Sequence, residues 1–414
     1  MGKNKKKQFD ILVIGGGAAG MMAAITAARN NQTVCILERL DKLGKKLLAT
    51  GNGKCNFTNE HMQVDCFRAE DSFVKSVIER FSVSDCLEFF RSIGVYPKNK
   101  NGYYYPNSEQ ASSVVNALYM ELQKQGVHIV YETIIQNIFP QEEDVIVETN
   151  KGSYVGKNVI IATGLLASPK LGSDGSLFSI IKSLGHDFEP VLPALCGFFC
   201  KGCNFKKISG VRAQGTVTAI IDGKEKAMDT GEIQFTDYGL SGIPVFQISH
   251  YLSRALYQKQ KVEIQLNLLP NFDKAQLLEE LYYRKTMFSE QTVGNLLNGL
   301  LNQKLSQMIL EKCHLEEDIV ISSLSKREIE SIAYCIQNLK VKVTNYRDYE
   351  FAQVCTGGIP LSAIDANTFE SRLVKHIYFA GEILDVDGIC GGYNLHFAWA
   401  SGYMAAKAIV ERSL

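Results

Sequence analysis

The stretch DILVIGGGAAGMMAAITAARNNQTVCILERL, from Asp10 to Leu40, decides the fold. An apolar run over residues 9–14 predicts a buried parallel strand. Alanines at 23, 24, 27 and 28 favour a helix behind the glycines. A second apolar run over residues 33–37 predicts a strand that ends in an acid, Glu38. The order is therefore strand, tight glycine turn, helix, strand and acid.

The glycine turn has the spacing of a dinucleotide-binding site. Gly15 permits the sharp turn, Gly17 leaves room for a pyrophosphate, and Gly20 lets the helix pack close to the sheet. The free N–H groups of the first helical turn, at Ala18 and Ala19, would face the phosphates. A GxGxxG alone is weak evidence, but its full strand–helix–strand setting predicts dinucleotide binding.

Glu38 lies 18 residues beyond Gly20, near the distance expected for an acid that binds ribose hydroxyls. Arg39 follows it and joins the predicted cofactor site. This unit alone does not separate NAD from FAD, but three later stretches favour FAD.

The first of these stretches is KKLLATGNGKCNFTN, residues 45–59. A glycine-rich loop so close behind the acid is suited to wrapping a cofactor with backbone donors, and its lysines would add charge toward phosphates. An ordinary surface loop is the alternative. The predicted contacts in it are Lys45, Lys46, Asn52, Gly53 and Cys55, with Lys54 as a further charge.

The other two stretches are NVIIATG, residues 158–164, and IYFAGE, residues 377–382, followed by a GGYN turn and a helix over residues 395–409. In flavoproteins, strands that end in such glycine motifs return to the cofactor. The start of the helix over residues 395–409 would face the pyrimidine end of the flavin. The predicted contacts are Thr163, Gly164, Gly381, Glu382, Asp387, Gly392, Asn394 and Leu395, together with Ile134. We expect FAD to bind non-covalently, since no His or Cys stands in an evident flavinylation motif.

The chain resembles the FAD-binding family that contains aminoacetone oxidase and BaiN-like reductases. The resemblance spans residues 9–413 and is carried by GGGAAG (15–20), LER (37–39), ATGNGKCNFTN (49–59), GSDGSLF (172–178), GEIQFTDYGLSGIPVFQIS (231–249), VCTGGI (354–359) and YFAGEILDVDGICGGYNLHFAWASGY (378–403). One departure is that many members have Gly-Arg-x-Phe-Pro where this chain has GYYYP, so Tyr103 replaces an arginine that would grip an anion.

The resemblance implies an α/β fold, a Rossmann-like FAD-binding domain interrupted by an insert of a β-barrel plus a helical subdomain. The residue pattern agrees, because β-rich runs with turn signals follow residue 193 and a helical pattern follows residue 273. We expect a discontinuous FAD domain over 1–190 and 345–414. The barrel would take 191–270 and 320–344, and the helices 271–319.

Two absences narrow the chemistry. The chain has no second complete GxGxxG unit after a strand, so NADH or NADPH, if used, would dock transiently over the flavin. It also has no CxxxxC near the first glycines, which argues against disulfide reduction. The candidate proton donors for reduction of a C=C bond are Cys390, Tyr393 and His396, with Cys355 and Thr356 nearby. Packing is the alternative role for these side chains.

Three functions stay open at this point. The resemblance favours a reductase driven by NAD(P)H, acting on a bile-acid-like enone or on uracil of ribosomal RNA. An amine oxidase of the aminoacetone type is the second, and an RNA-binding protein with a structural flavin is the third. Basic residues in the insert would serve RNA, although a solvated face explains them equally: Lys201, Lys206, Lys207, Arg212, Lys274, Arg284 and Lys285.

The bulk composition is that of an ordinary globular protein. The 414 residues are 46% hydrophobic with a net charge of +0, which suggests two or three domains and no general affinity for nucleic acid. No run is long enough for a membrane span or signal peptide, and the basic start reads as a tail. Eleven scattered cysteines favour a reduced, cytoplasmic protein. The Cys200–Cys203 pair lacks a zinc partner pair, so we expect no metal. The sequence does not indicate an oligomeric state.

Overall fold

The computed structural model describes residues 7–413, so most of the predicted basic tail lies outside the described residues. The chain divides into two compact units. Unit 1 comprises Met1–Leu192 and Gln353–Leu414, and unit 2 comprises Pro193–Ala352. Unit 1 is thus built from both ends of the chain, with unit 2 as an insert between them.

Unit 1 is built on a sheet of seven strands among residues 7–413. Its main path runs β7 (His128–Val130), β2 (Val34–Leu37), β1 (Lys7–Ile14), β10 (Gly152–Ile161), β9 (Val145–Thr149) and β8 (Ile135–Pro140), and β19 (Ile377–Phe379) pairs with β10. Strands β7, β2, β1, β10 and β19 are parallel to one another, whereas β9 pairs antiparallel with both β10 and β8. The four residues of β2 are fully buried, as expected for a parallel strand covered on both faces.

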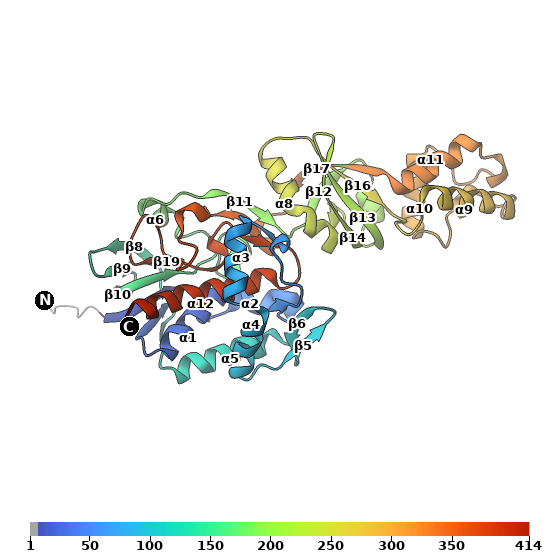
Figure 1. Cartoon of the computed structure of the whole chain (residues 1–414). Helices are drawn as coiled ribbons and strands as arrows, with labels where there is room; N and C mark the ends of the chain where they lie inside the picture. Colours follow the sequence, from blue (N-terminus) through green and yellow to red (C-terminus); the bar gives the residue numbers. More distant parts are fainter. Residues whose placement is uncertain (1–6, 414) are drawn as a thin grey trace. The chain divides into compact units, whose positions relative to one another are not determined.

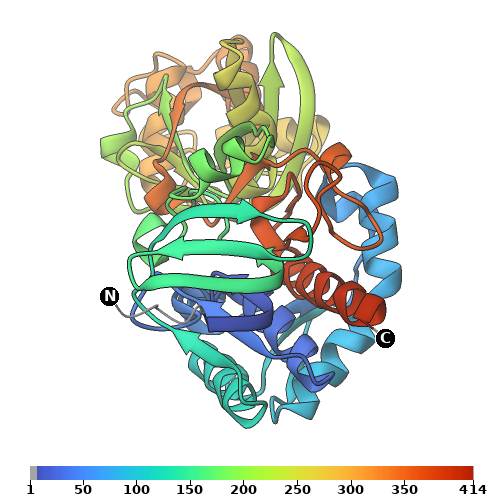
Figure 2. The same cartoon turned by 90° about the vertical axis from the view of Figure 1, so that its left-hand side faces the viewer.

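Helices surround this sheet (Figures 1 and 2). They are α1 (Ala18–Arg29), α2 (Lys45–Ala49), α3 (Asp71–Arg80), α4 (Val83–Ser92), α5 (Ala111–Lys124), α6 (Phe178–Ser183) and α12 (Tyr393–Ser413). Of these helices, α1, α6 and α12 contact the strands of the sheet. Helix α1 contacts the sheet, α5 and α12, so the first and last helices of the chain lie side by side. At this contact a Cβ on Gly402 would lie 2.2 Å from the carbonyl oxygen of Ala19. The absence of a side chain therefore sets how closely the two helices approach.

Three small sheets complete unit 1. They are formed by β3 (Thr58–Asn59), β6 (Tyr103–Pro106) and β5 (Pro97–Lys100); by β20 (Asp387–Gly388) and β4 (Phe67–Arg68); and by β11 (Glu189–Ala194) and β18 (Val354–Gly358). Each of the last two pairs joins segments from the two halves of the chain. These pairs join the C-terminal segment of unit 1 to its N-terminal segment.

Unit 2 contains a closed β-barrel and a group of helices. The barrel order is β12 (Phe198–Lys201), β15 (Gly239–Ser241), β14 (Lys224–Phe235), β13 (Arg212–Ile221), β16 (Val262–Asn267) and β17 (Leu339–Tyr346), which pairs back to β12. The helices are α7 (Phe205–Ile208), α8 (Ile243–Tyr257), α9 (Lys274–Met287), α10 (Gln303–Lys312) and α11 (Lys326–Gln337). This architecture confirms the predicted fold class. Helix α11 lies beyond residue 319, where the sequence led us to expect the return of the barrel.

None of the helices within residues 7–413 combines the length and the apolar character needed to cross a membrane.

Candidate active site

The glycine and acid motifs meet where the parallel strands β2, β1, β10 and β19 end. A Cβ on Gly15 would lie 2.7 Å from the Ala162 carbonyl oxygen and 3.2 Å from the Thr163 Cα. A Cβ on Gly381 would lie 2.9 Å from the Cβ of Ala19. Motifs that are far apart in the sequence therefore share one edge of the sheet, which is the usual ligand-binding edge of such folds.

The start of α1 is open to a ligand. Its first intrahelical hydrogen bond runs from the N–H of Met21 to the carbonyl of Gly17, and no side chain caps the preceding N–H groups. A Cβ on Gly17 would meet no protein atom within 4 Å, whereas one on Gly20 would lie 1.9 Å from the Gly15 carbonyl oxygen. Gly20 is thus required by packing, and Gly17 leaves space that the protein does not fill.

Glu38 stands beside this turn with only 8% of its surface exposed. The Gly16 N–H donates to its Oε2 at 2.6 Å, and the Leu40 N–H donates to its Oε1 at 2.8 Å. Burial raises the pKa of the Glu38 carboxyl, and these two N–H donors oppose the rise. The carboxylate is held by backbone at a fixed position beside the glycine turn, as a ribose-binding acid needs to be.

We expect Glu38→Ala to weaken FAD retention by about 10- to 100-fold, since a hydrogen bond to a charged group contributes about 1.5–3 kcal/mol. The measurement is the flavin-to-protein ratio after dialysis, with FAD titration of the stripped protein. Glu143→Ala, at an exposed position, is the control. Unchanged FAD affinity in Glu38→Ala would remove this residue from the site.

The loop over residues 50–59 has an irregular backbone. Gly51, Asn52 and Cys55 have φ values of 55°, 54° and 57°, in the left-handed region that non-glycine residues rarely adopt. The Asn56 Oδ1 atom is buried and has no hydrogen-bond partner among the described residues. Strained backbone and an unsatisfied buried acceptor are typical of a ligand-binding loop.

This loop reaches the start of α12. The Asn59 side chain donates to the Gly391 carbonyl at 2.9 Å. A Cβ on Gly392 would lie 2.9 Å from Asn56 Oδ1. The two glycines before α12 have φ values of 133° and 94°. The loop over residues 50–59 and the glycine turn at 391–392 therefore meet at the N-terminus of α12. The first turn of this helix contains no acidic residue.

The basic residues predicted to face phosphates are all held in ion pairs. Lys45 pairs with Asp41 at 2.5 Å, Lys46 with Glu382 at 2.6 Å, Lys54 with Glu109 at 2.8 Å, and Arg39 with Asp174 at 2.6 Å. Only the Lys46–Glu382 pair joins two predicted cofactor residues. The Cys355 N–H donates to the other oxygen of Glu382 at 2.9 Å, which fixes the carboxylate between two segments.

The remaining predicted cofactor residues have different surroundings. Asn394 both donates to the Gly388 carbonyl and accepts from the Gly388 N–H, each at 2.8 Å, and so fixes the turn before α12. Asp387 is buried in β20, and Leu395 lies in the first turn of α12. Ile134 follows Thr133, whose N–H donates to the Glu38 carbonyl, but the Ile134 side chain is 52% exposed.

Tyr393 and Cys390 lie at the beginning of α12. Tyr393 is buried, packs edge-on against Phe67 and hydrogen-bonds with Cys66. Burial, reinforced by the Cys66 contact, raises the pKa of Tyr393, so the phenol holds its proton at neutral pH. Cys390 is half-buried and free of any disulfide. Burial raises the pKa of Cys355 to about 12, so that thiol is also neutral.

His396 has surroundings that favour packing over proton transfer. It is fully buried, with Nδ1 2.8 Å from Thr58 Oγ1 and Nε2 3.0 Å from the Phe81 carbonyl oxygen. Burial lowers the pKa of His396 to about 4. With both ring nitrogens engaged and the ring neutral, His396 ties α12 to β3 and to the end of α3.

Sequence reasoning missed two residues. Asn56 stood inside the quoted glycine-rich loop, and its polar side chain among small residues was a usable signal. Asp174 pairs with Arg39 across 135 residues, and nothing in the local sequence indicated that partnership. Its GSDGS segment lies beside the site, since a Cβ on Gly164 would lie 2.9 Å from Ser173 Oγ.

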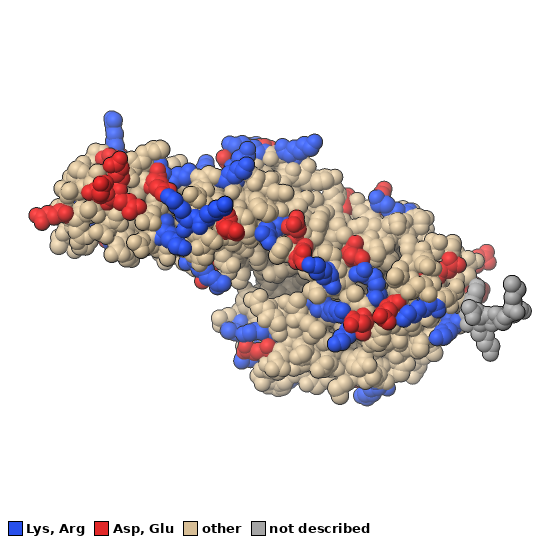
Figure 3. Space-filling view, turned by 180° about the vertical axis from the view of Figure 1, so that it is seen from behind, with Lys and Arg blue, Asp and Glu red and all other residues tan. Residues whose placement is uncertain are grey.

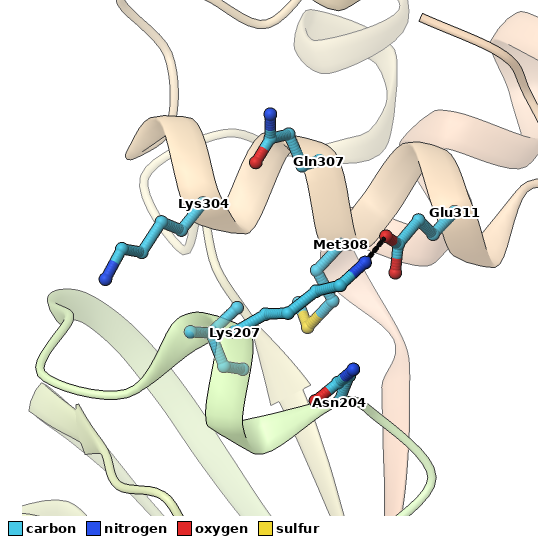
Figure 4. Close-up of a pocket in the computed structure, with 7 residues that line it drawn as sticks. Asn204, Lys207, Lys304, Gln307, Met308 and Glu311 are labelled. Atoms are coloured by element: carbon cyan, nitrogen blue, oxygen red, sulfur yellow. Dashed lines mark hydrogen bonds and ion pairs between the residues drawn. The ribbon is translucent and has the colours of Figure 1, made fainter.

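A small pocket in unit 2, between α7 and α10, does not suit a substrate (Figure 4). Lys207 reaches from α7 toward Glu311 of α10, with Met308 below them. Its volume of about 20 Å³ is close to that of one water molecule. Within residues 7–413, no group of three or more His, Cys, Asp or Glu side chains is placed to hold a metal ion.

Fold and site together define the class, a flavoprotein on a Rossmann-type dinucleotide fold. A family profile described as the HI0933-like protein Rossmann domain matches residues 9–408. The chain belongs to this HI0933-like family.

Two curated proteins and one solved structure show how far the similarity extends. The chain is 38% identical over 403 residues to a 3-dehydro-bile acid delta(4,6)-reductase of Clostridium scindens, covering 97% of this chain and 98% of that protein. It is 30% identical over 406 residues to a ribosomal RNA dihydrouridine synthase of Haemophilus influenzae, covering 96% and 98%. The 3-ketosteroid delta1-dehydrogenase of Sterolibacterium denitrificans shares the fold, with TM-score 0.52 and 10% identity over 98% and 100%.

The residues present fit FAD. The open space at Gly17, the uncapped start of α1 and the unsatisfied Asn56 Oδ1 are the features that a bound dinucleotide would complete. With family and fold established, the chain is an FAD-dependent oxidoreductase, as the sequence predicted.

Proposed function

We propose that the protein reduces an activated C=C bond conjugated to a ring carbonyl, as in a 3-oxo-4,6-diene steroid, with NADH or NADPH as electron donor. The observation that carries this proposal is the 38% identity, over nearly the whole of both chains, to a reductase of that substrate class. Tyr103 supports the proposal. A tyrosine at this position can pack against an apolar ring system, whereas the arginine that many family members carry there would favour an anion.

The chain's own residues would hold and orient the cofactor. The Gly15–Gly20 turn and the start of α1 would bind the pyrophosphate, and Glu38 would bind a ribose. The loop around Asn56 and the start of α12 would hold the flavin end. When bound, FAD supplies hydride transfer, which no amino-acid side chain performs.

The second half of the reaction needs a proton at carbon, and we assign its donation to Tyr393. The Tyr393 hydroxyl is neutral and is positioned by Cys66 at the beginning of α12. Tyr103 lies beside it, since a Cβ on Gly391 would come within 3.0 Å of both rings. Two tyrosines at this turn would offer the substrate both an apolar surface and a proton source.

We expect Tyr393→Phe to slow substrate reduction by about 100-fold or more, because a positioned acid contributes about 10²–10⁴ to such a step. Bleaching of the flavin by NADH or NADPH needs no proton donor and should change little. Stopped-flow absorbance measures the two half-reactions separately. Cys390→Ala is the matched comparison at the same turn, and a selective loss in that variant alone would transfer the role to Cys390.

Three of the basic residues predicted to serve RNA are held in ion pairs, which argues against ribosomal RNA as the substrate. Lys207 pairs with Glu311 at 2.5 Å, Arg212 with Glu232 at 3.2 Å, and Arg284 with Glu280 at 2.6 Å. Figure 3 shows acidic side chains gathered at the left end of that view, over the helical part of unit 2, with basic side chains beside them. Phosphate binding favours unpaired cations on one surface.

The test is anaerobic flavin bleaching of the full-length, FAD-loaded protein. We expect NADH or NADPH to bleach it and a 3-oxo-4,6-diene steroid to restore the colour without oxygen. Bleaching by aminoacetone alone, with peroxide formed in air, would make the protein an amine oxidase. Restoration of colour by a ribosomal RNA fragment and not by the steroid would place it with the RNA-modifying relatives.

A further inference from the structure

Three half-buried cysteines gather in unit 2, whereas the flavin motifs belong to unit 1. Cys203 follows β12, Cys313 caps the C-terminus of α10, and Cys335 lies on α11. Cys313 and Cys335 hydrogen-bond through their side chains, and Cys203 is close enough to Cys335 to influence its charge. All three thiols are reduced, and the proposed flavin chemistry does not use any of them.

The surroundings distinguish Cys313 from its neighbours. Ser331 lies one helical turn before Cys335 on α11 and donates its hydroxyl to Cys313 Sγ at 3.7 Å. Cys313 thus receives two donors from the same face of α11. These contacts lower the pKa of Cys313 to about 7. The pKa of Cys335 is instead raised, by its hydrogen bond to Cys313 and by burial. The exposed Lys312 places a positive charge near Cys335 and Cys203.

We propose that Cys313 and Cys335 form a reversible intrachain disulfide when the protein meets a hydroperoxide, with Cys313 as the attacking thiol and Cys335 as the resolving thiol. This modification site is separate from the proposed reductase chemistry and does not depend on it. The predicted Cys200–Cys203 motif is not part of it, because Cys200 is buried in β12, where its thiol donates to the Phe198 carbonyl.

The chemistry balances with hydrogen peroxide as oxidant. The Cys313 thiolate attacks one peroxide oxygen, so that an S–O bond forms, the O–O bond breaks and hydroxide leaves. Sulfur is oxidised by two electrons and the peroxide is reduced. Cys335 then loses its proton and attacks the sulfenic sulfur, so that the S–S bond forms and the S–O bond breaks. Hydroxide leaves and takes up that proton, and the first hydroxide takes up the proton that Cys313 released on forming its thiolate. In sum, two thiols and one peroxide give one disulfide and two waters.

The bond would join the end of α10 to α11. Glu311, two residues before Cys313, and Asn204, next to Cys203, also line the small pocket of Figure 4. Oxidation would therefore fix the contact between the helices and leave the barrel strands unchanged.

The test uses the full-length, FAD-loaded protein treated with hydrogen peroxide, then alkylated and analysed as peptides by mass spectrometry. We expect a Cys313–Cys335 cross-linked peptide to form at least about 10-fold faster than oxidation of Cys66, a half-buried thiol with a raised pKa, and to disappear with dithiothreitol. Cys335→Ser should accumulate a dione-trappable sulfenic acid at Cys313, and Cys313→Ser should show none at Cys335.

Two outcomes would overturn the proposal. One is oxidation of Cys313 and Cys335 no faster than that of Cys66 in the unmodified chain, a result that needs no variant to fold. The other is a cross-link from Cys313 to Cys203, which would assign the resolving role to a different thiol.

Discussion

Gly17→Val should give a folded protein that has lost its flavin. Gly17 has φ −81° and ψ −164°, a backbone conformation open to any residue, and a Cβ there meets no protein atom within 4 Å. The side chain would instead occupy the space through which a pyrophosphate approaches the backbone. We expect FAD affinity to fall by about 100-fold or more, equivalent to about 3 kcal/mol. FAD titration followed by fluorescence measures the loss.

The matched comparison is Gly20→Ala, three residues further along. There a Cβ would lie 1.9 Å from the Gly15 carbonyl oxygen, so the smaller substitution should damage the fold itself. Thermal unfolding of the flavin-free proteins separates the two effects. A Gly17→Val protein that retains FAD at wild-type affinity would contradict the assignment of this turn to the pyrophosphate.

Gly402→Ala should destabilise the protein, although alanine is the better helix former. Propensity alone predicts a gain of about 1 kcal/mol for this change inside a helix. The added Cβ would lie 2.2 Å from the Ala19 carbonyl oxygen, and the two helices that carry these atoms both pack on the sheet as well as on each other. We expect a net loss of about 1–3 kcal/mol in the free energy of unfolding, the usual cost of overpacking.

Denaturant unfolding of the flavin-free protein measures this change. Lys407→Ala, at an exposed position of the same helix, is the control and should change stability by less than about 0.5 kcal/mol. Equal or increased stability in Gly402→Ala would mean that α1 and α12 separate easily. The clash with the Ala19 carbonyl lies in the first turn of α1, where the pyrophosphate is expected to bind. We therefore expect a lower affinity for FAD to accompany the loss of stability.

The sequence predicted those parts of the site that local patterns encode. A strand, a glycine turn and a helix follow each other within residues 7–29, and each glycine has a separate steric reason that can be deduced from its spacing. The acid at Glu38 follows from the same unit. The fold class was predicted because the flavin motifs return after a β-rich and a helical segment.

What the sequence could not supply were the contacts made across long separations. His396 looked like a proton donor because it stands next to a flavin motif, but Thr58 and Phe81 occupy both of its nitrogens. The lysines within residues 45–54 looked free to bind phosphate, yet each is paired with a carboxylate. The partner of Lys46 is Glu382, far away in the sequence. Such partnerships depend on tertiary packing, which a local pattern does not contain.

The split of unit 1 has a consequence for how the protein is made. Strand β19 and helix α12 pair with β10 and α1, but they leave the ribosome only after the whole insert, Pro193–Ala352. Helix α12 begins at Tyr393, long after α1 ends at Arg29. At about 5–20 residues per second, the apolar surface of α1 therefore stays uncovered for roughly 20–70 s. We therefore expect the insert to be able to fold before unit 1 is complete, and FAD to bind only after α12 has been synthesised.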